Sequence, residues 1–247
     1  MRSYLIANWK NSPASEREAL EIIKGLKRVN VYRRLHTFVA PPFVYFGSVA
    51  KGIKGAASLA SQNIFPGTGV HTGEVTIDIL KSFGVKLAII GHSERRALGE
   101  TDKDVSKKIK TVLAAGIIPL VCVGEKDRDP DGEHFEFLRL QLRHSLEGVS
   151  KENSKKLIVA YEPVWAIGAK AKGAVKPKDL SQSVIYIRKI LNDLFGREVA
   201  DKIPVLYGGS VDASNCVELS ETGIRGFLVG RASLEPKSFK AIAECLI

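Results

Sequence analysis

Short apolar runs alternate with longer amphipathic segments along almost the whole chain. Each run is apolar at nearly every position and rich in β-branched residues, which is typical of strands buried on both faces of a parallel sheet. The segments between the runs carry apolar residues three and four positions apart, which is the helical period. Eight runs predict strands: Tyr4–Ala7, Thr37–Ala40, Ala57–Ala60, Leu87–Ile90, Ile117–Val123, Leu157–Tyr161, Ile203–Tyr207 and Gly226–Val229.

The clearest predicted helix runs from Ser15 to Arg28. It opens on a capping box, Ser15-Glu16-Arg17-Glu18, and leucines and isoleucines follow at helical spacing. The last predicted helix, over residues 234–246, has a similar apolar stripe. Shorter helices are predicted at residues 43–52, 72–83 and 212–220, and β-branched residues weaken the helical character of the second of these.

The 247 residues divide into eight units of about 31 residues, enough for one strand, one helix and two short loops each. No linker or low-complexity segment interrupts the series, so we expect one domain spanning residues 1–247. Eight such units favour a closed (β/α)8 barrel, the TIM-barrel fold, over an open doubly wound sheet. An open sheet that bound a dinucleotide would carry a Gly-x-Gly-x-x-Gly turn after its first strand, where this chain has Asn8-Trp9-Lys10-Asn11-Ser12.

Composition narrows the class of protein further. Apolar residues make up 45% of the chain and charged residues 26%, as in a globular protein with a large core. The 37 basic and 27 acidic residues leave a net charge of +10, which favours anionic partners without choosing among them. Cys122, Cys216 and Cys245 are too few and too widely separated for a disulfide framework, which favours a reducing cytoplasm. No apolar stretch approaches the roughly 18 residues of a membrane span.

Polar residues follow the predicted strands, and in a barrel the carboxyl ends of all strands meet at one mouth. The two longest loops, at residues 62–73 and 166–177, lie on the same face. The polar strand-end residues are Asn8, Lys10, Gln62, Asn63, His92, Ser93, Glu94, Glu125, Glu162, Gly208-Gly209-Ser210 and Gly230-Arg231. We expect these residues to form a single site.

A lysine, a histidine and carboxylates around one cavity supply the groups that remove a proton from a carbon next to a carbonyl. Glu162 is the best candidate base, because Pro163 holds it extended at the end of its strand. A glutamate that pairs with Lys170 or Lys172 of the following loop is the alternative. For His92 the alternative is a structural histidine with satisfied hydrogen bonds.

The glycines after the seventh and eighth strands are more specific than any one titratable group. Each pair precedes a predicted helix, so the backbone N–H groups of Gly209, Ser210, Gly230 and Arg231 are expected to bind an anion with help from helix dipoles. A phosphate site built from these two loops recurs in barrels of this kind. Tight turns would explain one glycine pair more easily than both.

Five motifs resemble those of triosephosphate isomerases, in the family's order and at its spacing from the first strand to the last helix. They are Asn8-Trp9-Lys10, Gly91-His92-Ser93-Glu94-Arg95-Arg96, Ala160 to Gly168, Leu206-Tyr207-Gly208-Gly209-Ser210-Val211 and Gly226 to Gly230. The resemblance implies an isomerase of glycolysis and gluconeogenesis that interconverts dihydroxyacetone phosphate and glyceraldehyde 3-phosphate without cofactor or metal.

The resemblance also implies a role for each catalytic residue. Glu162 would move a proton between two carbons, and His92 would act as a neutral electrophile on the oxygens. Lys10 would neutralise the phosphate and the enediolate, with Asn8 helping to place it. Glu94 would pair with Lys10 or support proton transfer.

The same family resemblance assigns functions to the long loops. Residues 163–177 resemble a lid whose closure excludes water and brings the Gly168 N–H to the phosphate, which Gly209, Ser210, Gly230 and Arg231 also bind. The loop 62–72 resembles one that reaches into a neighbouring subunit, so a homodimer is expected. Thr72 would then touch Lys10 and His92 of the partner subunit.

Three positions depart from the family pattern. The lid tip, residues 168–174, is about one residue longer and more basic than usual. Arg231 stands where a second glycine is usual; we expect its N–H to bind phosphate and its side chain to point away from the mouth. Arg225 stands where an acidic residue is common, so an ion pair of that region is expected to be missing, at a cost below about 1 kcal/mol if the site is exposed.

Two other functions remain to be weighed. A barrel that works as an interaction protein would use its basic surface for nucleic acid or another anion, but no recognition motif supports it and the lysines are scattered as on a solvated surface. A Schiff-base aldolase would need a lysine on a central strand, whereas Lys10 follows the first strand. The expected partners are therefore a triose phosphate and a second copy of the chain, and neither nucleic acid nor a membrane.

Overall fold

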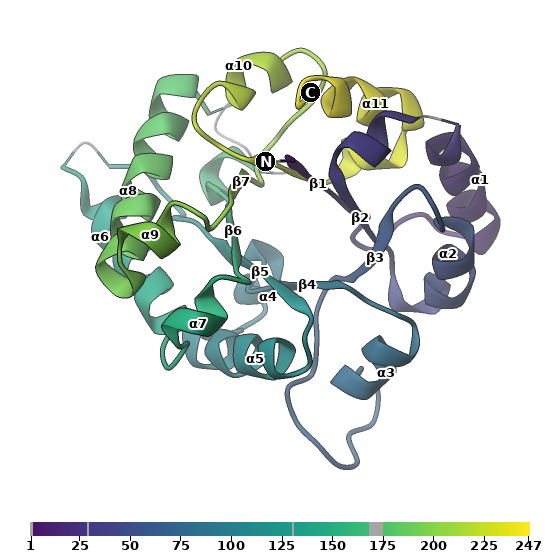
Figure 1. Cartoon of the computed structure of the whole chain (residues 1–247), viewed down its shortest axis with the longest axis horizontal. Coiled ribbons are helices and arrows are strands. Elements are labelled where there is room, and N and C mark those ends of the chain that lie inside the picture. The colour runs from purple at the N-terminus through teal and green to yellow at the C-terminus, as the bar shows by residue number, and fades with distance from the viewer. Residues whose placement is uncertain (1, 29, 130, 168–174) are drawn as a thin grey trace.

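Eight parallel strands close into a barrel in sequence order, each hydrogen-bonded to the next and the last to the first (Figure 1). The computed structural model describes residues 2–28, 30–129, 131–167 and 175–247. The strands are β1 (Tyr4–Asn8), β2 (His36–Ala40), β3 (Ser58–Ser61), β4 (Leu87–Ile90), β5 (Ile118–Val123), β6 (Ile158–Tyr161), β7 (Val205–Tyr207) and β8 (Gly226–Val229). The predicted (β/α)8 fold is confirmed.

Every predicted strand is present. The bounds of β4 and β8 match the prediction, and the others differ by one or two residues. The largest difference is in β7, which begins at Val205 instead of Ile203. Pro204 has no N–H to donate to a strand ladder, although its carbonyl still accepts a hydrogen bond of 2.9 Å from Val159 of β6.

Helices surround the barrel and form its outer ring (Figure 1). The α-helices are α1 (Glu16–Lys27), α2 (Phe46–Gly52), α3 (Ile77–Ser82), α4 (Ser93–Ala97), α5 (Asp102–Ala114), α6 (Glu133–Ser145), α7 (Lys151–Ser154), α8 (Pro177–Phe195), α9 (Arg197–Ala200), α10 (Cys216–Ser220) and α11 (Pro236–Glu244). Short 3-10 helices are η1 (Asn30–Arg34), η2 (Phe43–Tyr45), η3 (Val164–Ala166) and η4 (Arg231–Leu234).

The helix starts show where the sequence predictions held and where they did not. Ser15 caps α1 as predicted, since its Oγ accepts the N–H of Glu18 at 3.3 Å. The helix predicted from Thr72 begins only at Ile77, and the one predicted from Asp212 begins only at Cys216. In the second case the Asp212 carboxylate accepts the N–H of Ser214 at 2.8 Å, which holds the chain in a turn before the helix.

Alternation along the strands divides the core into two layers. Ile6 of β1 points into the barrel and packs with the inward residues of other strands, among them Phe38, Leu87 and Leu206. Leu5 belongs instead to the larger apolar layer between the strands and the helices. The barrel interior is thus filled by side chains, which leaves ligand binding to its ends.

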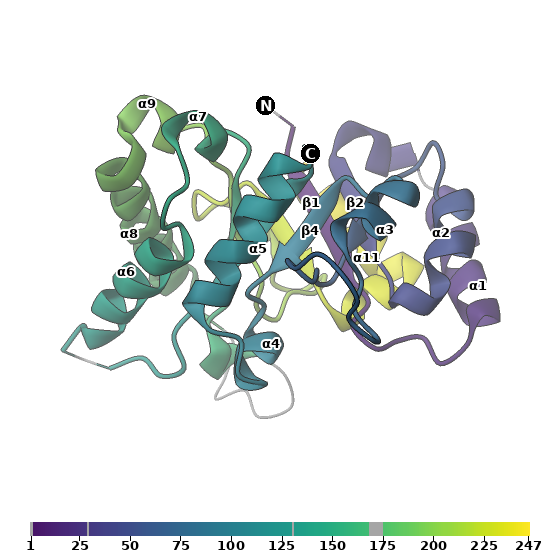
Figure 2. The ribbon, with the colours of Figure 1, turned by 90° about the horizontal axis from the view of Figure 1, so that it is seen from below.

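The two ends of the barrel carry different elements. In Figure 2, α4 lies at one end, whereas α7, α9 and both chain termini lie at the other. Because α4 follows the carboxyl end of β4, the α4 end is the mouth at which strand-end residues meet.

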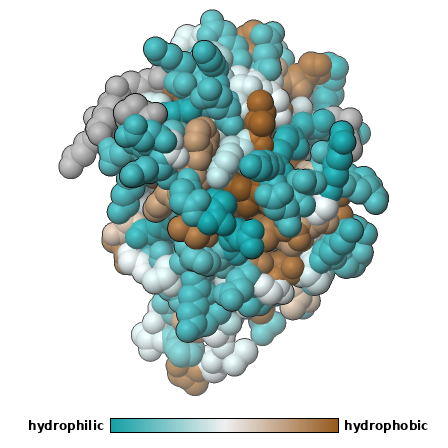
Figure 3. All heavy atoms as spheres, turned by 90° about the vertical axis from the view of Figure 1, so that its left-hand side faces the viewer, coloured by the Kyte–Doolittle hydropathy of each residue, from teal (hydrophilic) through white to brown (hydrophobic). Residues whose placement is uncertain are grey.

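The outer face that carries α6 and α8 is mostly hydrophilic (Figure 3). Phe137, Leu140 and Ile185 are among the exposed apolar side chains on these two helices. Scattered exposed apolar residues of this kind are ordinary on a globular protein. Within the described residues, no helix is both long enough and apolar enough to span a bilayer.

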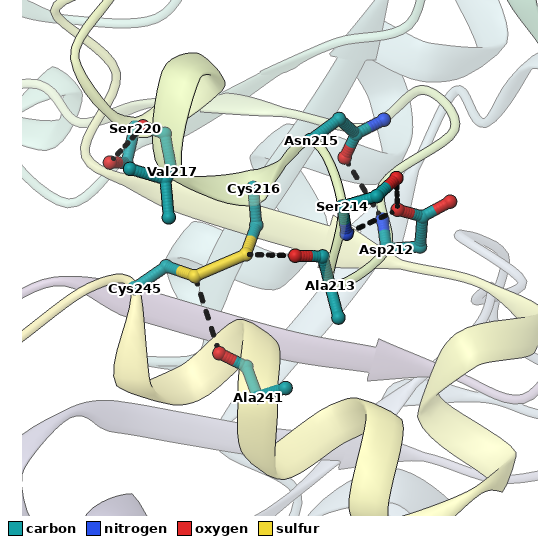
Figure 4. The surroundings of a disulfide bond; sticks show 9 residues. All are labelled: Asp212, Ala213, Ser214, Asn215, Cys216, Val217, Ser220, Ala241 and Cys245. Atoms are coloured by element: carbon teal, nitrogen blue, oxygen red, sulfur yellow. Dashed lines mark hydrogen bonds between the residues drawn. A yellow bond between two sulfur atoms is a disulfide. The ribbon is translucent and has the colours of Figure 1, made fainter.

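A disulfide bond joins Cys216 at the start of α10 to Cys245 just after α11 (Figure 4). The two cysteines are 29 residues apart, and their Cα atoms are 6.2 Å apart. The cysteines were expected to be too few and too widely separated for a disulfide framework, and this bond corrects that expectation for Cys216 and Cys245. It also removes the argument from cysteine usage for a reducing compartment. The third cysteine, Cys122, is a free thiol buried inside the barrel.

Candidate active site

A cavity of about 310 Å3 opens at the mouth of the barrel. Strand ends of β1, β4, β7 and β8 supply most of its lining. Its walls contain Asn8, Lys10, His92, Ile167, Gly208 to Asp212, Leu228 and Gly230 to Ala232. Chain segments more than 200 residues apart in sequence therefore converge on one site. The strand-end prediction is met only in part, because the lining does not include Gln62, Asn63, Ser93, Glu94, Glu125 and Glu162.

Lys10 is held by its neighbours in a backbone conformation that L-residues rarely adopt. Its φ of 54° lies in the left-handed region. The Asn8 side chain accepts the Lys10 N–H at 3.1 Å, and Gln62 Nε2 donates to the Lys10 carbonyl at 2.7 Å. Gln62 also donates to the Ala40 carbonyl at 2.9 Å, so it joins the turn after β1 to the end of β2. These bonds fix where the lysine side chain starts.

The ammonium of Lys10 forms an ion pair with Glu94 of α4. The lysine side chain is 27% exposed and the glutamate 57% exposed. An ion pair this open to water contributes between zero and about 1 kcal/mol. A bound anion can therefore replace Glu94 as the partner of Lys10 at little cost.

Glu162 is buried directly after β6 and accepts a hydrogen bond from the start of α4. Its Oε2 accepts the N–H of Ser93 at 2.9 Å, which places a carboxylate at the positive end of a helix. Its other oxygen, Oε1, has no hydrogen-bond partner among the described residues and lies 3.1 Å from Nε2 of His92. The predicted alternative partners, Lys170 and Lys172, lie outside the described residues.

His92 precedes α4, and its surroundings assign its tautomer. Nδ1 accepts the N–H of Glu94 at 3.2 Å, so this nitrogen carries no proton. A neutral ring then carries its proton on Nε2, the nitrogen that lies beside Glu162. The imidazole thus offers an N–H donor next to an unpaired carboxylate oxygen.

Two glycines give Glu162 the room it occupies. A Cβ on Gly124 would lie 1.7 Å from the carbonyl oxygen of Glu162, which no relaxation of a side chain could relieve. A Cβ on Gly208 would lie 2.9 Å from Cγ of Glu162 and 3.4 Å from its Oε1. Gly124 requires glycine because the backbone of Glu162 approaches so closely, whereas a Cβ at Gly208 would force only the Glu162 side chain to shift.

The backbone N–H groups of Gly209, Ser210, Gly230 and Arg231 donate no hydrogen bond to another described residue. They lie in two loops that line the same cavity. The expectation that both loops open helices is half wrong. Gly230 directly precedes η4, but the loop after β7 reaches α10 only at Cys216, so no helix dipole acts on its N–H groups.

Arg231 is exposed and lines the cavity. Its guanidinium makes no ion pair or hydrogen bond with the described residues. Gly168, expected to complete the phosphate site, lies outside the described residues. Thr72 is exposed in the loop before α3 and is not part of the cavity wall of its own chain.

Glu125 was expected at the mouth but is buried beneath η3, at the start of the loop that follows β6. Its Oε1 accepts hydrogen bonds of 2.8 Å from both the Tyr161 hydroxyl and Nε1 of Trp165. Burial, reinforced by the Glu125 charge, raises the pKa of Tyr161 above its usual range, so the phenol remains a donor. Glu125 thereby anchors η3, and Ser210 adds a hydrogen bond of 3.0 Å to the Ala166 carbonyl.

The described residues of the site show no arrangement that favours a metal. Within the described ranges, no group of three or more histidine, cysteine, aspartate or glutamate residues is placed to hold an ion. The groups that the structure brings together are two carboxylates, Glu162 and Glu94, one imidazole, one ammonium and free backbone N–H donors. This set suits proton transfer on an anionic substrate.

Comparison with known proteins agrees with the geometry. The triosephosphate isomerase family matches residues 3–246. The chain belongs to the triosephosphate isomerase family. Proteins named triosephosphate isomerase from Dictyoglomus thermophilum and Clostridium botulinum (strain Okra / Type B1) are 40% and 39% identical to it, over 98% and 99% of this chain and 99% and 100% of their own. One from Fusobacterium nucleatum is 39% identical over 99% of both chains.

For this member of the triosephosphate isomerase family, the sequence indicated the residues at the centre of the site better than the residues that hold them in place. Gln62, Ser93 and Glu125 were recognised only as strand-end residues, and their partners became visible in three dimensions. The available signal was their position directly after a strand. Nothing in the sequence indicated that Gln62 would bind the Lys10 carbonyl, 52 residues away.

Proposed function

We propose that the chain interconverts dihydroxyacetone phosphate and glyceraldehyde 3-phosphate through an enediolate. The observation that carries this proposal is the unpaired Oε1 of Glu162, which is buried 3.1 Å from Nε2 of His92. The His92 ring itself lies in the wall of the mouth cavity, so the carboxylate sits directly behind that wall. Membership of the triosephosphate isomerase family supports the choice of substrate. The reaction oxidises one carbon and reduces its neighbour within one molecule, so it balances by moving protons alone.

Glu162 acts as the base in this proposal. Oε1 takes a proton from the carbon beside the carbonyl and returns it to the neighbouring carbon. The Ser93 N–H holds the other oxygen during both steps, so the carboxylate keeps its orientation. Nε2–H of His92 donates to the oxygen on which negative charge develops and exchanges its proton between the two oxygens of the enediolate.

Lys10 and the two glycine loops bind the charged parts of the substrate. The ammonium leaves its exposed pairing with Glu94 and neutralises the phosphate and the enediolate. The free N–H groups of residues 209, 210, 230 and 231 receive the phosphate oxygens. Residues 163–177 form the lid in this proposal, and Glu125 anchors its first turn through Trp165. Closure of this lid would exclude water from the intermediate and bring the Gly168 N–H to the phosphate.

A coupled assay with dihydroxyacetone phosphate tests the proposal. We expect the wild-type chain to isomerise it and Glu162→Gln to lower kcat by roughly 10²–10⁴-fold, the usual scale of general acid–base catalysis. Glutamine is a suitable replacement because its carbonyl oxygen still accepts the Ser93 N–H. Wild-type protein without activity, or a fully active Glu162→Gln variant, would overturn the proposal.

We also propose that the chain forms a homodimer through the loop before α3. The N–H of Phe65 donates to the Val75 carbonyl at 2.9 Å, which closes the base of the loop, and the loop projects beyond the helix ring (Figure 1). Val70 in this loop is 100% exposed and Leu98 is 78% exposed, an apolar surface that a second copy would cover. Thr72 would then reach Lys10 and His92 of the partner subunit.

Light scattering on the purified chain tests the dimer. The expected mass is twice 26.9 kDa. Val70→Asp places a charge in the proposed interface and should shift the mass towards that of one chain, whereas the same change at exposed Val217 on α10 should not. A monomeric wild-type protein would refute this assembly.

A cytoplasmic location completes the proposal, because phosphate esters carry charge and remain in the compartment where they are made. Fractionation of the source cells with an antibody to the chain tests it. Recovery in the membrane or external fraction would contradict it.

A further inference from the structure

A second cavity, of about 510 Å3, lies at the opposite end of the barrel from the mouth. Residues just before or at the starts of β1, β2, β5, β6, β7 and β8 line it, together with residues that follow α7 and α9. Figure 2 shows α7 and α9 at the end of the barrel that carries the termini. Strands of three to six residues put this basal cavity roughly 15 Å from the mouth.

The walls of the basal cavity are strongly basic. They contain six lysine and arginine side chains, Arg2, Lys155, Lys156, Arg188, Lys202 and Arg225, but only one carboxylate, Asp201. A concave surface with one sign of charge concentrates ions of the opposite sign. Part of the +10 net charge of the chain therefore lies in the wall of the basal cavity.

Most of this charge is not neutralised by neighbouring carboxylates. Lys155 pairs with Glu152 at 2.6 Å and Lys202 with Glu198 at 3.0 Å, outside the cavity wall. For the other four basic side chains of the wall, the described residues offer no carboxylate oxygen within 4.0 Å. Four cationic groups, three of them guanidiniums, are therefore available to a ligand.

Arg188 and Arg225 occupy fixed positions in the wall. The Arg225 N–H donates to the Val205 carbonyl at 2.7 Å and its carbonyl accepts the Tyr4 N–H at 2.8 Å, which fixes its backbone between β7 and β1. Arg188, on α8, donates to the Gly223 carbonyl at 3.3 Å. Burial is the main cause that lowers the pKa of Arg188; the Asp201 charge opposes it, and the Arg225 charge adds a smaller lowering. A bound anion would favour the charged guanidinium, as Asp201 does.

We propose that the basal cavity binds a small molecule carrying a chain of phosphate groups. A guanidinium presents paired N–H donors that match phosphate oxygens, and several such groups in one wall favour an anion of several charges over a single carboxylate. The cavity is also larger than the mouth cavity, about 510 Å3 against 310 Å3, which suits more than one phosphate. This site is separate from the isomerase site and does not depend on the function proposed for it.

Calorimetry with inorganic tripolyphosphate and with ATP, at constant ionic strength and without magnesium, tests the proposal. We expect both to bind wild-type protein, with affinity that falls as salt is raised. If tripolyphosphate and ATP bind with similar affinities, the cavity recognises the phosphate chain alone. If ATP binds at least tenfold more tightly than tripolyphosphate, the cavity also recognises the nucleoside. No binding of either probe overturns the proposal.

Three variants locate the binding. Arg225→Glu should weaken tripolyphosphate at least about tenfold, because it puts an acid beside Arg188, while triose phosphate isomerisation stays unchanged. Lys51→Glu on α2 makes the same charge change at an exposed residue outside this cavity and should bind normally. Lys10→Ala should also bind normally.

Loss of binding in Lys10→Ala with retention in Arg225→Glu would move the ligand to the mouth and refute the basal site. Equal weakening by Lys51→Glu and Arg225→Glu would refute it as well, because the effect would then follow net charge alone. If Arg225→Glu does not fold, the neutral variant Arg225→Gln serves in its place, with circular dichroism as the check.

Discussion

Replacing Gly208 with alanine tests whether the position of the Glu162 carboxylate, as well as its chemistry, determines turnover. Gly208 follows β7, and the new methyl group would lie 2.9 Å from Cγ of Glu162. Gly208 is not among the glycines with positive φ, so alanine fits its backbone conformation. The perturbation is therefore steric and aimed at one side chain.

The geometry sets the size of the effect. Ordinary contacts of a Cβ begin at 3.4 Å, so the glutamate side chain has to move by about 0.5 Å. Glu162 cannot move as a whole, because its N–H donates to the Val123 carbonyl at 2.7 Å and its own carbonyl lies against Gly124. The shift then falls on the carboxylate and its 3.1 Å approach to His92. A displacement of 1 Å costs up to about 10²-fold in rate, so we expect kcat to fall by about tenfold, or about 1.4 kcal/mol.

Steady-state kinetics with both triose phosphates measures the effect, with KM expected to stay within about threefold because the phosphate donors remain. Gly47→Ala on α2 is the matched control: its new Cβ would meet only Phe83 at 3.9 Å, and alanine inside a helix should keep activity and add up to about 1 kcal/mol of stability. A folded Gly208→Ala enzyme with unchanged kcat, or with its loss entirely in KM, would refute this reasoning.

Four further predictions address other parts of the structure. Arg231→Gly should leave KM within about tenfold in the isomerase assay, because its N–H is the expected phosphate donor; a larger change would assign the guanidinium to binding. Cys216→Ser should lower the free energy of unfolding by up to about 3.6 kcal/mol, the chain-entropy value for a loop of 29 residues. In urea titrations, reductant should lower the stability of the wild-type protein by the same amount. Equal unfolding midpoints in oxidant and reductant would contradict the Cys216–Cys245 bond. Cys122 should not react with iodoacetamide at pH 8 until the protein unfolds. Burial, and to a smaller extent the Glu162 charge, raises the pKa of its thiol well above the usual range. Rapid labelling of the folded protein would contradict this, because it would show an accessible thiolate. Arg96→Lys should cost about 2 kcal/mol in the same titrations, because lysine cannot reproduce the guanidinium hydrogen bonds to the Gly91 carbonyl at 2.8 Å and to Asp102 at 2.6 Å; an unchanged midpoint would show that these bonds add nothing.

The order of strands and the convergence of the central residues could be predicted from the sequence. Strands buried on both faces appear as continuous apolar runs, and their carboxyl ends share one face of a barrel. Asn8 and His92 therefore line one cavity, and Glu162 lies against His92. Short sequence motifs predicted the structure correctly where the interacting residues are close together in the chain. Ser15 caps a helix because its partner, Glu18, is three residues away.

Contacts between distant segments could not be predicted in this way. The hydrogen bond from Gln62 to Lys10 and the disulfide between Cys216 and Cys245 each depend on how loops pack after the barrel closes. Nothing in the local sequence specifies such distances, because many partners are chemically equivalent until the fold selects one.

The sequence by itself determined the barrel and the family to which the chain belongs, and it pointed to the residues expected to transfer protons, because hydrophobic period and residue chemistry are properties of the chain. The tertiary structure alone decided which oxygen of Glu162 is free, which nitrogen of His92 carries the proton, and that six basic residues from separate segments surround one cavity at the base. These are statements about distance and direction, and they arise only when the strands close and bring remote groups within a few ångströms of one another.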